Sequence, residues 1–208
     1  MSNEAICQAL MKGRAAEVKT LVQQAIDAGA KPATILNEGL LQGMGIIGAK
    51  FKKNEVYVPE VLIAARAMKA GMEILKPHLV AAGVQPLATA VIGTVKGDLH
   101  DIGKNLVGMM LEGAGFRVVD GGIDVPPEKF IELARTHGAR VIGVSALLTT
   151  TMTNMKLVVD AVKESGIACK VMIGGAPVTQ AYSDEIGASG YAPDAASAAD
   201  LAKKLCAA

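Results

Sequence analysis

The chain has 208 residues, of which 51% are hydrophobic and 20% charged, and its formal net charge is +1. This composition is typical of a globular protein of one or two domains, and the near-neutral charge argues against broad electrostatic binding to nucleic acid or to an anionic membrane. The apolar runs are too short to span a bilayer, and the N-terminus lacks the basic and then apolar pattern of a signal peptide. We therefore expect a cytoplasmic protein that binds neither nucleic acid nor membrane.

The first part of the chain has helical periodicity. Apolar residues recur at three- and four-residue intervals in four segments, around residues 6–10, 18–25, 36–51 and 58–75. Four amphipathic helices with short connections predict a four-helix bundle, which we assign to residues 1–80. Residues 77–87 contain Pro77, Gly83 and Pro86, and we expect them to form a linker because these residues discourage a continuous helix.

In the second part, apolar strands alternate with helical segments. The predicted strands cover residues 87–95, 116–119, 140–147, 169–173 and, more weakly, 190–191, and a closing helix covers 195–205. Strict alternation is typical of a parallel, doubly wound sheet, because parallel strands need crossover helices. We therefore expect an α/β domain over residues 87–208 with a flavodoxin-like (Rossmann-like) order of five strands.

Three loops of this domain carry the residues of chemical interest. They follow the first, third and fourth predicted strands, and cover residues 97–103, 145–151 and 174–177. In doubly wound sheets ligands bind outside the carboxyl ends of the strands, at the point where the strand order reverses. The proposed order brings the three loops to one side of that point, where a large ligand could lie across the edge of the sheet.

His100 is the candidate metal ligand, and Asp98 stands two residues before it. A ligating imidazole usually donates its other ring N–H to a carboxylate, which fixes its tautomer. Taken alone, however, a histidine near an aspartate is more often an ordinary loop residue. The nearby glycines Gly97, Gly103, Gly174 and Gly175 could likewise serve only as turns.

Taken together, the residues of the three loops indicate one kind of site much more specifically than any of these residues does alone. They contain Asp98-Leu99-His100-Asp101-Ile102-Gly103, then Ser145-Ala146-Leu147, then Gly174-Gly175. This combination resembles the cobalamin-binding signature of methionine synthase, of B12-dependent mutases and of methyltransferase corrinoid proteins. Residues 51–61 also resemble the helical cap of methionine synthase and of the small corrinoid proteins, a cap that mutases typically lack.

The resemblance implies roles for individual residues. His100 would be the lower axial ligand of cobalt, Asp98 would bind its far nitrogen, and Thr151 would complete the relay. The other signature residues would line the cofactor site: Gly97, Leu99, Asp101, Gly103 and Leu147. Ser145 and Thr149 would contact the nucleotide tail of the cofactor, Gly174 and Gly175 would let it pass close to the backbone, and Asp194 and Ala195 align loosely near its end.

Phe51, Val58 and Val61 match positions that cap the upper face of the corrin. The simpler interpretation is that they belong to the core of the bundle, because apolar stripes on helices usually just pack.

The function implied by the resemblance is a non-catalytic methyl carrier. Its cofactor would be cobalamin, present as methylcobalamin in the loaded state, and its partners a donor-specific methyltransferase, an acceptor methyltransferase and a reductive activator protein. The donor stays open among methanol, methylamines, glycine betaine and aryl methyl ethers, and the acceptor between tetrahydrofolate and a thiol coenzyme. One alternative is a cobalamin-dependent sensor, which would carry a DNA-binding domain ahead of the bundle. Another is a nucleotide or flavin binder, but no GxGxxG follows the first strand.

Overall fold

The computed structural model describes residues 3–207. They divide into two compact units, one ending at Pro86 and the other beginning at Leu87. Each unit is described by itself. Within the described residues, no helix combines the length and the apolar character needed to cross a bilayer.

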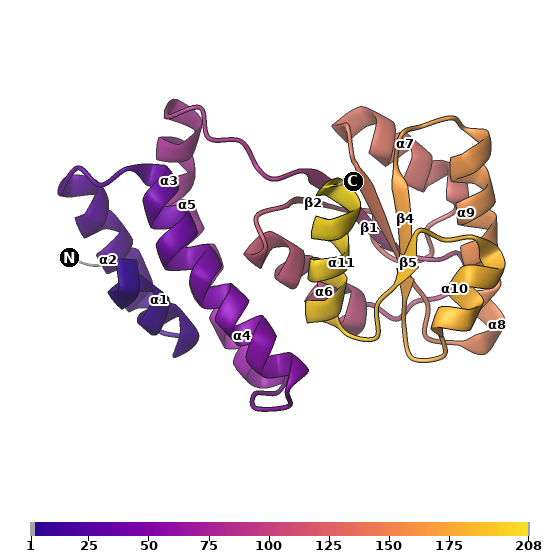
Figure 1. Cartoon of the computed structure of the whole chain (residues 1–208), viewed down its shortest axis with the longest axis horizontal. Helices are drawn as coiled ribbons and strands as arrows, with labels where there is room; N and C mark the ends of the chain where they lie inside the picture. Colours follow the sequence, from indigo (N-terminus) through magenta and orange to yellow (C-terminus); the bar gives the residue numbers. More distant parts are fainter. Residues whose placement is uncertain (1–2, 208) are drawn as a thin grey trace. The chain divides into compact units, whose positions relative to one another are not determined.

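The first unit is helical, as predicted. Its elements are α1 (Asn3–Met11), α2 (Ala15–Asp27), α3 (Pro32–Thr34), η1 (Ile35–Leu41), α4 (Gln42–Lys52) and α5 (Val58–Ala81). Because α3, η1 and α4 follow one another directly, the described residues of this unit form four helical segments (Figure 1). Apolar side chains from all four are fully buried, among them Leu10, Val18, Leu40 and Leu75, and they form the core of the unit.

The third helical segment contains a π-helical stretch that the sequence pattern does not predict. Ile35–Leu41 is a π-helix, and the residues flanking it, Thr34 and Gln42, have ordinary right-handed helical backbone angles. The spacing of apolar residues indicates which face of a helix is buried, but it does not distinguish i→i+5 from i→i+4 hydrogen bonding.

The prediction that Pro77 belongs to a linker is wrong, because α5 continues through Pro77 to Ala81. A proline inside a helix removes one backbone hydrogen bond, but here the cost is offset by packing. Leu75 and Leu79, on either side of the proline, are both buried. The helix ends instead before Gly83, whose φ of +68° is left-handed.

The second unit is a parallel α/β sheet. Its strands are β1 (Thr89–Thr94), β2 (Arg117–Asp120), β3 (Val141–Ser145), β4 (Lys170–Gly174) and β5 (Gly190–Tyr191). Its helices are α6 (Ile102–Gly113), α7 (Pro127–His137), α8 (Thr149–Met152), α9 (Asn154–Glu164), α10 (Gln180–Ile186) and α11 (Ala195–Ala207). The strand order is β2-β1-β3-β4-β5 with every pair parallel, which confirms the flavodoxin-like prediction.

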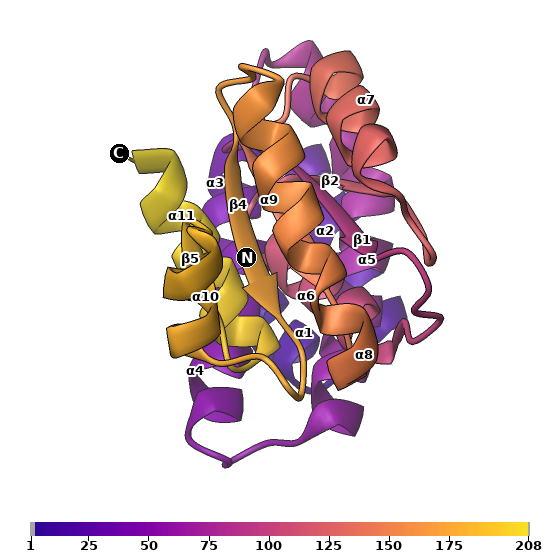
Figure 2. The same ribbon diagram turned by 90° about the vertical axis from the view of Figure 1, so that its right-hand side faces the viewer.

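Helices cover both faces of this sheet. α6 and α11 pack together on one face, and α7 and α9 pack together on the other (Figures 1 and 2). The central strands are therefore buried on both sides, which explains why they appear in the sequence as continuous apolar runs. Gly93 in β1 allows Phe130 of α7 to lie against the strand, since a Cβ there would come within 2.7 Å of the phenyl ring.

Candidate functional site

The candidate site begins where three strands end together. Thr94, Ser145 and Gly174 are the last residues of β1, β3 and β4, and they are direct partners in the register of the sheet. The pairing extends one residue further, because the Val95 N–H donates to the Ser145 carbonyl at 3.0 Å. The loops after these strands therefore start at the same edge, as the sequence predicts.

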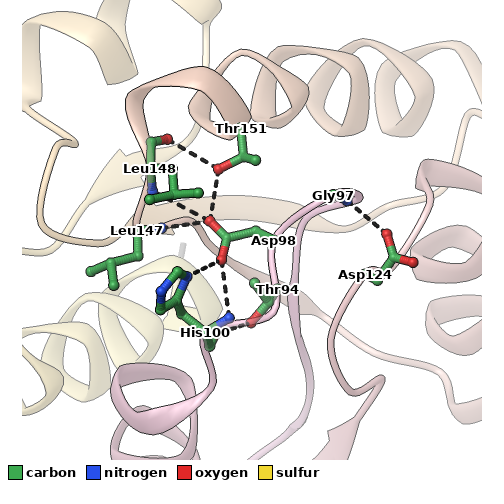
Figure 3. Close-up of polar contacts among 8 residues, drawn as sticks. All are labelled: Thr94, Gly97, Asp98, His100, Asp124, Leu147, Leu148 and Thr151. Carbon is green, nitrogen blue, oxygen red and sulfur yellow. Dashed lines mark hydrogen bonds and ion pairs between the residues drawn. The ribbon is translucent and has the colours of Figure 1, made fainter.

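Asp98 is the centre of the hydrogen-bonding network at this edge (Figure 3). Its side chain is 0% exposed. Oδ1 accepts hydrogen bonds from the backbone N–H of His100 at 3.0 Å and from the ring Nδ1 of His100 at 2.7 Å. Oδ2 accepts from the Leu147 N–H at 2.8 Å, the Leu148 N–H at 3.4 Å and the Thr151 hydroxyl at 2.7 Å. One carboxylate thus joins the loop after β1 to the loop after β3.

These donors keep the Asp98 carboxylate ionised. Burial by itself raises the pKa of Asp98, but the hydrogen bonds from Thr151, Leu147 and His100 outweigh burial and hold that pKa well below its usual range. An ionised carboxylate has no proton to donate, so the hydrogen between Asp98 and the ring must lie on Nδ1 of His100.

His100 is held on one side and open on the other. Its carbonyl accepts a hydrogen bond from the Thr94 hydroxyl at 2.8 Å, and its Nδ1 is bound to Asp98. Its side chain is 49% exposed, and within the described residues Nε2 has no hydrogen-bond partner. In the tautomer with its hydrogen on Nδ1, the ring presents the Nε2 lone pair outward, which is the form that ligates metals.

Thr151 closes the network from the first turn after β3. Its Oγ1 lies 2.7 Å from Asp98 Oδ2 and 3.0 Å from the Leu148 carbonyl. The hydroxyl has one hydrogen, and the ionised carboxylate is the stronger acceptor of the two. The expected relay of His100, Asp98 and Thr151 is therefore a continuous set of contacts.

Removing this hydroxyl should destabilise the protein. Thr151→Val keeps the shape of the buried side chain but leaves Asp98 with one donor fewer, and we expect a loss of about 1–3 kcal/mol in the free energy of unfolding. Urea unfolding of the cofactor-free protein measures it. Thr153→Val is the matched control, because the Thr153 hydroxyl is exposed and bonds only to the Thr150 carbonyl. Equal stabilities for the two variants would show that Thr151 adds nothing to the network.

The glycine pair after β4 lies against the loop after β3. Gly175 has a φ of +133°, a conformation open almost only to glycine, and a Cβ there would lie 1.9 Å from the Ala146 carbonyl oxygen. At Gly174 a Cβ would lie 3.0 Å from the Ala192 carbonyl oxygen. The backbones of three neighbouring segments thus approach one another more closely than side chains would permit.

Gly175→Ala should lower the free energy of unfolding far more than the same change at an ordinary left-handed glycine. The backbone strain alone costs about 1–3 kcal/mol, and the contact with Ala146 adds to it, so we expect a loss of more than about 3 kcal/mol. Gly166→Ala is the control, because Gly166 has a φ of +67° with nothing within 4 Å, and we expect about 1 kcal/mol there. Thermal unfolding of both variants measures the difference, and similar losses would contradict the close approach.

The remaining predicted residues lie at or near the same edge, outside the hydrogen-bonding network of Asp98. Leu99 and Thr149 are exposed, Gly103 has open space around it, and Asp101 accepts a hydrogen bond from the Asn105 side chain. Asp194 caps the start of α11 by accepting hydrogen bonds from the backbone N–H and hydroxyl of Ser197, and Ala195 is buried as the first residue of that helix. Cofactor contacts for these residues stay predictions.

The three predicted cap residues belong to the helical unit. Phe51 lies near the end of α4 and is half-buried, Val58 begins α5 and is 37% exposed, and Val61 is 0% exposed. Their role in covering a corrin also stays a prediction.

Sequence reasoning missed four residues that support the loops. Thr94 binds the His100 carbonyl, Leu148 offers a backbone N–H to Asp98, and the Asn154 side chain donates to the Lys96 carbonyl at 2.7 Å. Asp124 accepts a hydrogen bond from the Gly97 N–H at 2.6 Å (Figure 3). Each contact joins segments that are distant in sequence or uses the backbone, so no local motif indicates it.

These features define a module that presents one oriented imidazole at the carboxyl edge of a parallel sheet. A metal-bearing cofactor fits this arrangement, because the donor set consists of a single ring nitrogen with a carboxylate behind it. Exposed apolar side chains on the same two loops offer it a surface, namely Leu99, Ile102, Leu147 and Leu148.

Comparison with known proteins identifies the module. A family model described as a B12 binding domain matches residues 88–200, and a second model with the same description matches residues 3–76. The chain is 40% identical to a corrinoid protein of Desulfitobacterium hafniense over 95% of this chain and 94% of that protein. It is 46% identical to dimethylamine corrinoid protein 2 of Methanosarcina mazei over 84% and 83% of the two chains.

Solved structures agree with the sequence comparison. The crystal structure of the methanol:cobalamin methyltransferase complex of Methanosarcina barkeri contains a chain with a TM-score of 0.88 and 33% identity, covering 98% of this chain and 78% of that one. A cobalamin-binding protein of Desulfitobacterium hafniense has a TM-score of 0.80 and 29% identity, with 98% of each chain covered. The chain described here belongs to the B12-binding corrinoid proteins of methyltransferase systems.

Proposed function

We propose that this corrinoid protein carries a methyl group from a donor-specific methyltransferase to a second methyltransferase. The observation that supports the proposal best is the outward Nε2 of His100, held in its ligating tautomer by the buried Asp98. When bound, the corrinoid supplies a cobalt ion that can accept a methyl group and give it up.

In this proposal the chain's own residues control the lower side of the cofactor. His100 Nε2 would be the protein ligand, while Asp98 keeps the other ring proton on Nδ1 and prevents the ring from turning. Thr151 and the Leu147 N–H fix the carboxylate in turn. If the ring leaves the metal, Nε2 is the atom that can take up a proton.

The strand ends would hold the rest of the cofactor. Ser145 and Thr149 place hydroxyl groups at the end of β3 and the start of α8, and Gly174 and Gly175 expose backbone at the end of β4. We propose that the nucleotide tail of the corrinoid lies along this edge, past the two glycines, whose missing Cβ atoms let the backbone segments around Ala146 and Ala192 pack closely against the end of β4.

The similar proteins indicate which donors to test first. Relatives 43–46% identical to this chain are named dimethylamine and trimethylamine corrinoid proteins. We propose that the donor is a methylamine, with methanol as the next candidate because of the methanol:cobalamin methyltransferase structure. An acceptor methyltransferase and a reductive activator protein complete the proposed set of partners.

The function is tested by following an isotopically labelled methyl group. The purified protein is loaded with hydroxocobalamin, reduced, and mixed with a labelled methylamine or methanol, with and without the donor methyltransferase of a Methanosarcina relative. We expect label on the protein only when the methyltransferase is present. We expect it to leave the protein only when an acceptor methyltransferase and its thiol or folate are added.

Two outcomes would overturn the proposal. Sustained demethylation by the loaded protein alone would make it an enzyme in its own right. A cofactor-loaded protein that takes no label from any methylamine or methanol, with any donor methyltransferase of these systems, would contradict the carrier function with these donors.

A further inference from the structure

The loop after β2 contacts the backbone that leads into Asp98. The N–H of Asp124 donates a hydrogen bond to the Asp98 carbonyl at 3.1 Å, and Asp124 Oδ1 accepts one from the Gly97 N–H at 2.6 Å. One residue therefore holds the dipeptide Gly97–Asp98 at both of its ends. Figure 3 shows Asp124 reaching Gly97 from the side of the loop opposite to Thr151.

We call the pair of hydrogen bonds that Asp124 makes with Gly97 and Asp98 the clasp. Two of its residues, Asp124 and Gly97, have unusual backbone angles. Asp124 has a φ of +53° and Gly97 a φ of +82°, and within residues 3–207 the other non-glycine residue with a positive φ is Asn54. A left-handed aspartate is strained, and such strain persists where the surroundings determine the backbone conformation. Here the Gly121 N–H donates to Ile92, and the Val125 N–H donates to Thr94, so the loop is tied to β1 on both sides of Asp124.

We propose that Asp124 is a positioning residue for the cobalt-ligating imidazole, an inference that rests on the proposed role of His100. The Asp98 carboxylate can face both His100 and Thr151 only if the Asp98 backbone is fixed. The Asp98 N–H is bound to the Val95 carbonyl at 3.1 Å, the Lys96 carbonyl is bound by Asn154, and Asp124 adds the hydrogen bonds to the Gly97 N–H and the Asp98 carbonyl. Without the hydrogen bonds of Asp124, Gly97 is held less firmly, because glycine has the widest range of φ, and the range of directions in which His100 Nε2 points becomes wider.

Two substitutions separate the hydrogen bond from the backbone strain. Asp124→Gly keeps the left-handed backbone without strain but removes the acceptor for the Gly97 N–H. Asp124→Asn keeps a carbonyl oxygen as acceptor and tolerates the same φ, but removes the charge. Asp160→Ala is the control for the loss of an exposed carboxylate, because Asp160 is paired with Lys156 on α9.

The first readout needs no cofactor. Hydrogen exchange of the Gly97 amide, followed by NMR in the cofactor-free protein, should be about fivefold faster in Asp124→Gly, the factor that corresponds to one net hydrogen bond. It should stay within about twofold of wild type in Asp124→Asn and in Asp160→Ala. Unchanged exchange in Asp124→Gly would show that the clasp does not hold Gly97.

The second readout is the spectroscopic signature of His100 in the cobalamin-loaded protein. In protein labelled with ¹⁵N-histidine, the ratio of His-ligated to other Co(II) protein is read from the two-line nitrogen splitting in EPR across a pH series. This ratio should fall about fivefold in Asp124→Gly and be restored in Asp124→Asn. A wild-type ratio in Asp124→Gly, or an equal loss in both variants, would overturn the positioning role. Absence of His100 ligation in the wild type would instead overturn the proposed function, and the exchange experiment would still decide whether the clasp exists.

Discussion

His100→Ala should abolish the protein nitrogen ligand and weaken cobalamin binding by roughly a hundredfold or more, since even the loss of an outer hydrogen-bond partner typically costs about 10- to 100-fold in metal affinity. The reason is geometric: His100 Nε2 is the open nitrogen, with its lone pair available, at the edge where the three strand ends meet. Equilibrium binding of hydroxocobalamin, followed by its visible absorbance, measures the change.

The control for this substitution is His137→Ala, which removes a half-buried histidine of the same unit from the far end of α7. It should bind cobalamin as the wild type does. Equal affinities for the two variants would mean that the imidazole of His100 contributes no binding energy, and the assignment of His100 would fail.

Asp98→Asn should weaken cobalamin binding nearly as much as His100→Ala does, although it replaces only one oxygen of the side chain by an NH₂ group. Both oxygens of Asp98 accept hydrogen bonds from N–H groups, so the amide NH₂ must face donors whichever way it turns. If it faces His100, Nδ1 must become the acceptor, and the ring proton moves to Nε2, where it blocks ligation. If it faces Leu147, that backbone N–H loses its acceptor.

We therefore expect Asp98→Asn to lose about 2 kcal/mol or more of stability, because a buried donor is left unsatisfied, and about 10- to 100-fold of cobalamin affinity. Urea unfolding of the cofactor-free protein and cobalamin titration measure the two losses. Asp184→Asn is the control, since Asp184 is exposed and accepts one side-chain hydrogen bond from Gln180. Wild-type affinity in Asp98→Asn would contradict the tautomer argument.

The sequence predicts the architecture well because the signals are periodic. Alternating apolar strands and amphipathic helices lead directly to a parallel sheet in the order β2-β1-β3-β4-β5, with strand limits within about two residues. The two misses in the helical unit have different causes. Pro77 is tolerated because Leu75 and Leu79 are buried on either side of it, and the π-helical stretch Ile35–Leu41 leaves no trace in the apolar spacing.

Prediction of the site succeeds where contacts are local and fails where they are long-range. Asp98 and His100 are two residues apart, so their pairing can be inferred from the motif itself, and Thr151 was indicated by resemblance. Asp124 binds the Gly97 N–H although the two residues are 27 positions apart in the sequence. The contact depends on a left-handed backbone at Asp124, which cannot be predicted from the presence of an aspartate. The convergence of donors on one carboxylate becomes visible only when the sheet register is known.

The central claim, that His100 supplies the lower ligand of cobalt, is tested most directly by nitrogen isotope labelling. The protein is produced with ¹⁵N-histidine, loaded with unlabelled cobalamin and reduced to Co(II), and its EPR spectrum is compared with that of unlabelled protein. The account predicts that each three-line nitrogen splitting becomes a two-line splitting, because ¹⁵N has spin one half, and that His100→Ala removes this change. A splitting that stays three-line in the labelled protein would show that the cofactor's own base, and not His100, binds the metal.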